Sequence, residues 1–179
     1  MSIEITPLIS AQEIQDRLRE LGAQLDADYP DHNCPLILVG VLKGAFMVTA
    51  DLARSISRDV EIDFITISSY DEGTETSGNV RVLKDLNSSV EGKDVLIVED
   101  ILDTGLTLSK SNLIEKLTLQ KSNSVRILSL LDKPARRRAP ITPDYCGFVI
   151  DDEFVVGYGM DLAELYRNLP YVGILSQAE

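Results

Sequence analysis

The stretch from Val95 to Leu108, V-L-I-V-E-D-I-L-D-T-G-L-T-L, constrains the fold of this chain more than any other. Its four leading apolar residues predict a strand that is buried on both faces, as in parallel sheets covered by helices. Two adjacent carboxylates, Glu99 and Asp100, follow where such a strand would end, and a short loop then leads into a helical pattern. Because α/β proteins bind ligands at the carboxyl ends of parallel strands, the stretch predicts both a fold class and a site.

Strands and helices alternate along the rest of the chain. Strands are expected at residues 35–42, 60–70, 80–83, 95–98 and 125–131. An amphipathic helix is expected after the capping box Ser10-Ala11-Gln12-Glu13, and further helices at 45–56 and 107–120. This alternation predicts an α/β fold with a parallel sheet and helices on both faces.

The loop Asp103-Thr104-Gly105-Leu106-Thr107 has the composition of a phosphate-binding loop. Gly105 permits a turn that a Cβ would forbid, and the threonine hydroxyls and the N–H groups of the next helix can point into one concavity. The carboxylates of Glu99 and Asp100 only accept hydrogen bonds, so they suit a diol or a metal ion. A sugar phosphate, which carries both a phosphate and a vicinal diol, fits this pattern.

Other interpretations of the Asp-Thr-Gly sequence fit less well. It is also the signature of aspartic proteases, but these need two copies on an all-β scaffold, and the single copy here lies between a strand and a helix. Asp103 could instead be only a helix N-cap beside a solvated strand end. A G-x-x-x-x-G-K-[ST] loop is absent, and Gly157-Tyr158-Gly159 lacks the third glycine of the dinucleotide fingerprint, so ATP hydrolysis and NAD binding have little support.

Charge and composition exclude further classes. The formal net charge of -12 argues against nucleic-acid binding, and the only basic run, Arg136-Arg137-Arg138, is interpreted as a solvated loop. The N-terminus has no signal-peptide pattern, and no apolar run approaches the roughly 20 residues of a membrane span. Cys34 and Cys146 are too isolated for a disulfide framework or a zinc site. We therefore expect a cytoplasmic protein with no nucleic-acid partner and no membrane contact, and a single domain over residues 1–179.

The stretch from Val95 onward resembles the 5-phosphoribosyl-1-pyrophosphate (PRPP) signature of the type I phosphoribosyltransferases. Other segments match the bacterial hypoxanthine-guanine members of this family, in the same order: Leu42-Lys43-Gly44, Ser69-Tyr70, Leu130-Leu131-Asp132-Lys133, Asp152 to Tyr158, Asp161 and Arg167. The resemblance covers roughly residues 10 to 176. It implies the type I phosphoribosyltransferase fold, with a small hood over the base site formed by the N-terminal segment and the region after about residue 133.

The resemblance also implies an activity. Hypoxanthine or guanine would react with PRPP in the presence of Mg²⁺ to give IMP or GMP and pyrophosphate, with Asp103 as the general base. The implied phosphoribosyl site consists of Glu99, Asp100, Asp103, Thr104, Gly105, Leu106 and Thr107. Pyrophosphate would bind at Lys43, Gly44 and Arg167, the purine at Lys133, Phe154 and Val155, and the metal at Glu99, Asp100 and Asp161. Ser69 and Tyr70 would begin a lid that continues through the polar residues 71–79.

Alternatives remain on the same fold. A xanthine- or adenine-preferring transferase would share these motifs, and so would a nucleotide sensor that binds without turnover. The RNA-binding regulator of pyrimidine operons has the same phosphate loop, but the net charge of -12 does not provide its basic RNA face. The resemblance further implies a homo-oligomer, a dimer or a tetramer.

Overall fold

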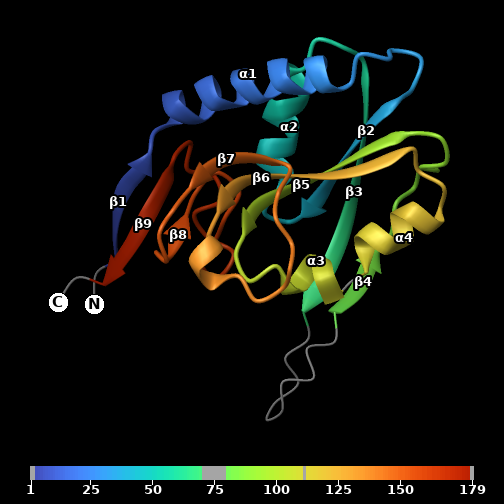
Figure 1. Cartoon of the computed structure of the whole chain (residues 1–179). Helices are drawn as coiled ribbons and strands as arrows, with labels where there is room; N and C mark the ends of the chain where they lie inside the picture. Colours follow the sequence, from blue (N-terminus) through green and yellow to red (C-terminus); the bar gives the residue numbers. More distant parts are fainter. Residues whose placement is uncertain (1–2, 70–79, 111, 178–179) are drawn as a thin grey trace.

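The structure, a computed structural model, describes residues 3–69, 80–110 and 112–177 of the 179-residue chain. Within these ranges the larger sheet has the strand order β4-β3-β2-β5-β6-β7 (Figure 1). Its strands are β2 (Leu36–Leu42), β3 (Val60–Ser69), β4 (Val80–Lys84), β5 (Asp94–Leu102), β6 (Ser124–Asp132) and β7 (Tyr145–Val149). All neighbouring pairs are parallel except β3 and β4, which confirms the predicted parallel sheet. The carboxyl ends of β2, β3, β5 and β6 therefore lie at one edge.

Helices cover both faces of this sheet (Figure 1). They are α1 (Ala11–Asp28), α2 (Phe46–Ser55), α3 (Leu106–Lys110) and α4 (Leu113–Leu119), with a 3-10 helix η1 (Pro134–Arg136) after β6. In β2, Leu36 and Leu38 enter the core beneath α1 and α2, while Ile37 and Val39 enter the core beneath α3 and α4. Burial on both faces explains the unbroken apolar sequence of this strand. None of the described helices is long and apolar enough to cross a membrane.

A second, smaller sheet lies beside the first (Figure 1). Its order is β1 (Ile3–Ile9), β9 (Val172–Gln177) and β8 (Val155–Val156), and both pairings are antiparallel. The sheet therefore joins the first described strand to the last. Because β8 directly follows Phe154, this sheet holds one of the segments expected to bind the purine.

The first helix forms as its sequence predicts. Glu13 N donates to Ser10 Oγ at 3.3 Å, and Ser10 N donates to Glu13 Oε2 at 2.8 Å, so the capping box is closed in both directions. Ile14, Leu18 and Leu21 follow at helical spacing, and each is at most 1% exposed.

Two predicted boundaries were wrong. The helix expected at 107–120 is divided into α3 and α4, because Asn112 adopts the left-handed conformation with φ of 50°. Asparagine tolerates this conformation better than most residues, and its side chain competes with helical hydrogen bonding. The strand expected at 95–98 extends to Leu102, so Glu99 and Asp100 lie within β5 and not beyond its end.

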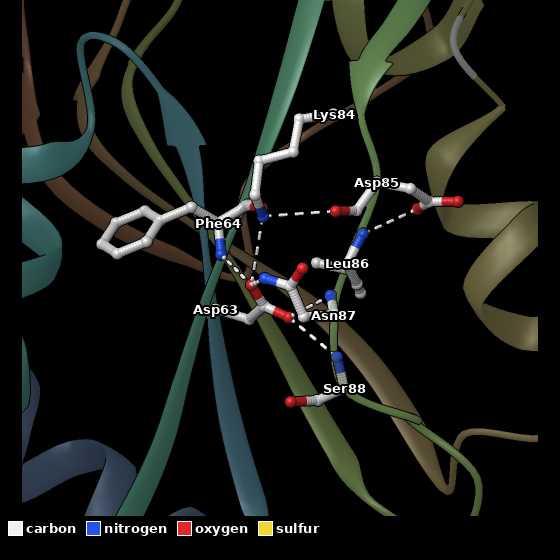
Figure 2. Close-up of polar contacts among 7 residues, drawn as sticks. All are labelled: Asp63, Phe64, Lys84, Asp85, Leu86, Asn87 and Ser88. Carbon is white, nitrogen blue, oxygen red and sulfur yellow. Dashed lines mark hydrogen bonds and ion pairs between the residues drawn. The ribbon is translucent and has the colours of Figure 1, made fainter.

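A buried carboxylate, Asp63 on β3, holds the segment that follows β4 (Figure 2). Asn87 N and Ser88 N donate to Asp63 Oδ2 at 2.6 and 3.0 Å, and Phe64 N donates to Oδ1 at 2.7 Å. Burial is the largest influence and raises the pKa of Asp63, but these N–H groups and Lys84 outweigh it, so the pKa lies below its ordinary value.

Asp63→Asn should therefore destabilise the protein at pH 7 by about 1–3 kcal/mol, because it removes the charge that the N–H groups stabilise. Since the folded-state pKa is lowered, this stabilisation is present above the unfolded pKa of about 3.9 and is lost as the pH falls through the folded value. Urea unfolding at several pH values measures the difference, which should shrink at acidic pH. Glu61→Gln is the matched control, because Glu61 lies on the same strand in a pair with Lys93 and is 42% exposed. A difference no larger than that of the control at pH 7 would contradict the prediction.

Candidate active site

Two adjoining pockets, of about 350 and 420 Å³, lie at the carboxyl ends of the parallel strands. The first is lined by residues that include Gly44, Glu99, Asp100, Asp103, Thr104, Gly105 and Thr107. The second is lined by residues that include Asp100, Asp103, Lys133, Arg136, Asp152, Phe154, Val155 and Asp161. Because Asp100, Ile101 and Asp103 line both, the pockets are two parts of one site. Most of the predicted site residues, although distant in sequence, meet here.

The phosphate loop is fixed by its own backbone and by a later segment. Gly105 has φ of +73°, and Thr104 Oγ1 accepts a hydrogen bond from Leu106 N at 3.3 Å. Arg138 N and Ala139 N both donate to the Thr104 carbonyl oxygen, at 3.0 and 3.1 Å. The loop is thus held from behind while its other side lines the first pocket. Leu106 was predicted to join the phosphate site, but it is not among the pocket-lining residues.

The carboxylates at the end of β5 are electrostatically strained. Burial raises the pKa of Glu99 well above its usual range, and the neighbouring Asp100 raises it further. Burial likewise raises the pKa of Asp100 to about 6, against the opposing effect of backbone N–H groups and Arg167. Asp100 also packs closely on the loop after β2, because a Cβ added to Gly44 would lie 1.8 Å from Asp100 Oδ2. A cationic or hydroxyl-bearing ligand would relieve the cost of these two charges.

Glu99→Gln should stabilise the ligand-free protein at pH 8 by about 1–2 kcal/mol, because the neutral amide removes a buried charge. The raised folded-state pKa means that ionisation of Glu99 opposes folding above its unfolded pKa of about 4.3 and has no effect well below it. The gain should consequently vanish at acidic pH. Urea unfolding at pH 3.5 and pH 8 tests this, with Glu115→Gln on the exposed side of α4 as control. A Gln variant that is less stable than wild type at pH 8 would overturn the prediction.

The residues expected to bind pyrophosphate meet beside the first pocket. Lys43 Nζ lies 2.9 Å from Glu164 Oε2, and Arg167 Nη2 lies 2.9 Å from Asp161 Oδ1. Arg167 Nη1 also donates to the carbonyl oxygen of Gly159 at 2.8 Å. Gly44 lines the first pocket, whereas Lys43 and Arg167 do not line either pocket and instead pair with acidic neighbours.

Gly159 joins this cluster to the loop after β2. It has φ of +102°, and a Cβ at this position would lie 2.1 Å from the carbonyl oxygen of Gly44. The segment around residue 159 can therefore approach the loop this closely only with a glycine.

The second pocket has the character expected of a purine site. Lys133 is 5% exposed, and its Nζ donates to the carbonyl oxygen of Glu153 at 2.5 Å. Phe154 is 53% exposed and lines the pocket, so its ring is accessible for stacking. Val155 is 7% exposed and is fixed in β8 by its pairing with Ile174 of β9.

The metal and lid predictions receive less support from the geometry. Within the described ranges, no group of three or more His, Cys, Asp or Glu side chains is arranged to hold a metal ion. The buried Glu99 and the half-buried Asp100 still offer two carboxylates to a cation, whereas Asp161 pairs with Arg167. Ser69 is the last residue of β3; Tyr70 and residues 71–79, which were expected to form the lid, lie outside the described residues.

The interpretation of Arg136-Arg137-Arg138 as a solvated loop was wrong for Arg137 alone, because Arg136 and Arg138 are both exposed. Arg136 pairs with Asp103 and Asp152 at 3.2 and 3.1 Å. The side chain of Arg137 is 14% exposed; it pairs with Asp132 and donates to the carbonyl oxygen of Ile141 at 2.5 Å. These contacts hold the Arg137 guanidinium inside the protein, whereas the Arg136 side chain stays 44% exposed despite its ion pairs.

The sequence interpretation missed several residues of the site. Arg136, Asp152 and Met160 line the second pocket, although none was assigned a role. Tyr158 was given no chemistry, and its Oη donates to Asp51 Oδ2 at 2.5 Å, which ties the segment after β8 to α2. The one available signal for Arg136 was its position three residues after Lys133 at the end of a strand.

The parallel sheet and the two-part site at its carboxyl edge are those of a phosphoribosyltransferase, and comparison with known protein families gives the same class. Residues 8–163 match the phosphoribosyl transferase domain. The chain therefore belongs to the phosphoribosyl transferase domain family, as its motifs predicted.

Within this family, the chain is similar to several proteins named as hypoxanthine or hypoxanthine-guanine phosphoribosyltransferases. The chain is 52% identical over 171 residues to the hypoxanthine-guanine phosphoribosyltransferase of Bacillus subtilis, covering 96% of this chain and 93% of that protein. It is 55% identical over 168 residues to the bifunctional protein TilS/HprT of Listeria innocua, of whose length it spans 25%. A crystal structure of a hypoxanthine phosphoribosyltransferase from Staphylococcus aureus has a TM-score of 0.87 and 52% identity, covering 95% of this chain and 90% of that one.

Proposed function

We propose that the protein is a purine salvage transferase that converts hypoxanthine or guanine and PRPP into IMP or GMP and pyrophosphate. The observation that carries the proposal is the shared lining of the two pockets: Asp103 stands between a phosphate loop and a pocket that offers Lys133 and Phe154. Such a site can hold a sugar phosphate and a flat oxo-purine side by side. The similarity to curated hypoxanthine-guanine phosphoribosyltransferases supports the same substrates.

In the proposed reaction a purine ring nitrogen attacks the anomeric carbon, the bond from that carbon to pyrophosphate breaks, and the purine proton passes to Asp103. The Thr104–Thr107 loop holds the 5′-phosphate, and Glu99 and Asp100 accept hydrogen bonds from the ribose hydroxyls. The two carboxylates also stabilise positive charge that develops on the sugar. Lys133 donates to the purine 6-oxo group while Phe154 stacks on the ring, and Lys43, Gly44 and Arg167 bind pyrophosphate.

Mg²⁺ is proposed as the cofactor. The carboxylates of Glu99 and Asp100, whose pKa values are raised by desolvation, fit a hard divalent cation, and Asp161 lies near enough to influence the pKa of Asp100. Bound magnesium would neutralise the charge of the departing pyrophosphate.

We further propose a cytoplasmic homo-oligomer, a dimer or a tetramer, with each chain a single domain. The small sheet formed by β1, β9 and β8 serves as the hood. Val155 of β8 and Phe154, which directly precedes this strand, both line the purine pocket. Ser69 and Tyr70, with residues 71–79, are proposed to form the lid.

Incubation of the protein with PRPP, Mg²⁺ and each purine base separately tests the proposal. Formation of IMP and GMP is expected. A preference for xanthine or adenine would instead identify one of the alternative transferases, and binding of PRPP without product would identify a nucleotide sensor. Specific RNA binding without turnover would favour the operon regulator.

A further inference from the structure

Arg136 bridges two carboxylates across the second pocket. Its Nε lies 3.2 Å from Asp103 Oδ1, and its Nη1 donates to Asp152 Oδ1 at 3.1 Å. We propose that Arg136 is a positioning residue that couples Asp103 to the purine-binding segment. The inference rests on the proposed function, and it assigns a role to a residue outside the family motifs noted above.

The first side of the bridge concerns the orientation of Asp103. Asp103 Oδ1 is buried from solvent and has no hydrogen-bond partner; the Arg136 guanidinium is the charge that faces it. With Oδ1 turned toward Arg136, Oδ2 is the oxygen left to receive a proton from a ligand. A base held in one rotamer avoids the reorientation that a free carboxylate would need before each turnover.

The second side of the bridge concerns the purine. Asp152 is followed directly by Glu153, whose carbonyl oxygen accepts the hydrogen bond from Lys133 Nζ, and by Phe154. The segment that holds Asp152 thus also fixes the donor and the ring expected to contact the base. A single guanidinium joins this segment to Asp103, so it can set the distance between the purine and its proton acceptor.

An arginine is suited to this task in a way that a lysine is not. The planar guanidinium presents separate donors in fixed directions, and here Nε and Nη1 serve different carboxylates. A lysine ammonium is a compact charge on a flexible stem, so Arg136→Lys would preserve the charge without holding both carboxylates in the same geometry.

The chain supplies its own control. Arg138 lies two residues away and is exposed, and no acidic side chain of the described residues pairs with it. Its contact with the phosphate loop is made by the backbone N–H, which a side-chain substitution keeps. Arg138→Ala therefore removes the same charge from the same segment without touching the bridge.

The test is steady-state kinetics of Arg136→Ala, Arg136→Lys, Arg138→Ala and Asp152→Asn, and of the Arg136→Ala/Asp152→Asn double variant. We expect Arg136→Ala to lower kcat/KM for hypoxanthine by about 10- to 100-fold with the KM for PRPP nearly unchanged, the scale that misplacement of a reacting group produces. Arg136→Lys should recover only part of this loss, and Arg138→Ala should resemble wild type. Asp152→Asn should add little in the Arg136→Ala background, because both changes break the same bridge.

Several outcomes would overturn the inference. Equal kinetics for Arg136→Ala and Arg138→Ala would mean that the bridge does nothing for the reaction, and full rescue by Arg136→Lys would mean that only charge matters. Additive effects of Arg136→Ala and Asp152→Asn would mean that the two residues act independently, so that no bridge couples Asp103 to Asp152. Absence of product from wild-type protein with every purine would remove the proposed function and the inference together, so the two failures are distinguishable. Thermal unfolding of each variant verifies folding, and Asp152→Asn retains the test if Arg136→Ala does not fold.

Discussion

Asp103→Asn should lower turnover by about 10²–10⁴-fold while PRPP affinity stays within several-fold of wild type. The amide keeps the shape of the side chain but cannot accept the purine proton. In the proposed site the phosphate is held by the loop backbone and by Thr104 and Thr107, which line the first pocket and which the substitution leaves in place. Single-turnover rates and PRPP binding, measured separately, distinguish the two effects.

The structure already weakens the alternative in which Asp103 is only a helix cap. α3 begins at Leu106, and the residue whose side chain accepts from the Leu106 N–H is Thr104. A capping role would predict nearly unchanged kinetics for the amide, since asparagine caps helices as well as aspartate does. Loss of PRPP binding with normal turnover at saturation would instead make Asp103 a ligand-positioning residue.

Strands β2, β3, β5 and β6 of the parallel sheet could be predicted because each carries its own local signal, whereas β7 (Tyr145–Val149) was not among the expected strands. Leu36 to Leu42 and Val95 to Val98 are continuous apolar runs that only burial on both faces explains. The small sheet had no such signal. β8 consists of Val155 and Val156 alone, and its existence depends on pairing with β9, which no local pattern reveals.

The residues of the candidate site also divide into those with a local sequence signal and those without one. Glu99, Asp100 and the Thr104–Thr107 loop could be assigned because strand ends, carboxylates and a glycine occur together in one short stretch. Arg136 and Arg137 could not, since a run of arginines beside prolines has the composition of a solvated loop. Their contacts are decided by tertiary ion pairs, such as that of Arg136 with Asp152 sixteen residues later.

Lys133 should give the second large effect, on the choice of purine. We expect wild-type protein to prefer hypoxanthine to adenine by about 10²–10⁴-fold in kcat/KM. An ammonium group only donates hydrogen bonds, so the 6-amino group of adenine would leave two donors facing each other, at about 1–3 kcal/mol for each unsatisfied group. The Lys133 ammonium cannot turn away from the 6-amino group into solvent, because the residue is 5% exposed and its Nζ donates to the Glu153 carbonyl oxygen.

Lys133→Met tests the assignment with a side chain of similar length and no charge. It should lower kcat/KM for hypoxanthine, reduce the ratio of hypoxanthine to adenine use, and leave the KM for PRPP near that of wild type, because Lys133 lines only the purine pocket. Competition assays with both bases measure the ratio directly. If wild-type protein used adenine as readily as hypoxanthine, the ammonium would not contact the 6-position. An unchanged ratio in Lys133→Met would mean that another residue lining this pocket discriminates between the two bases.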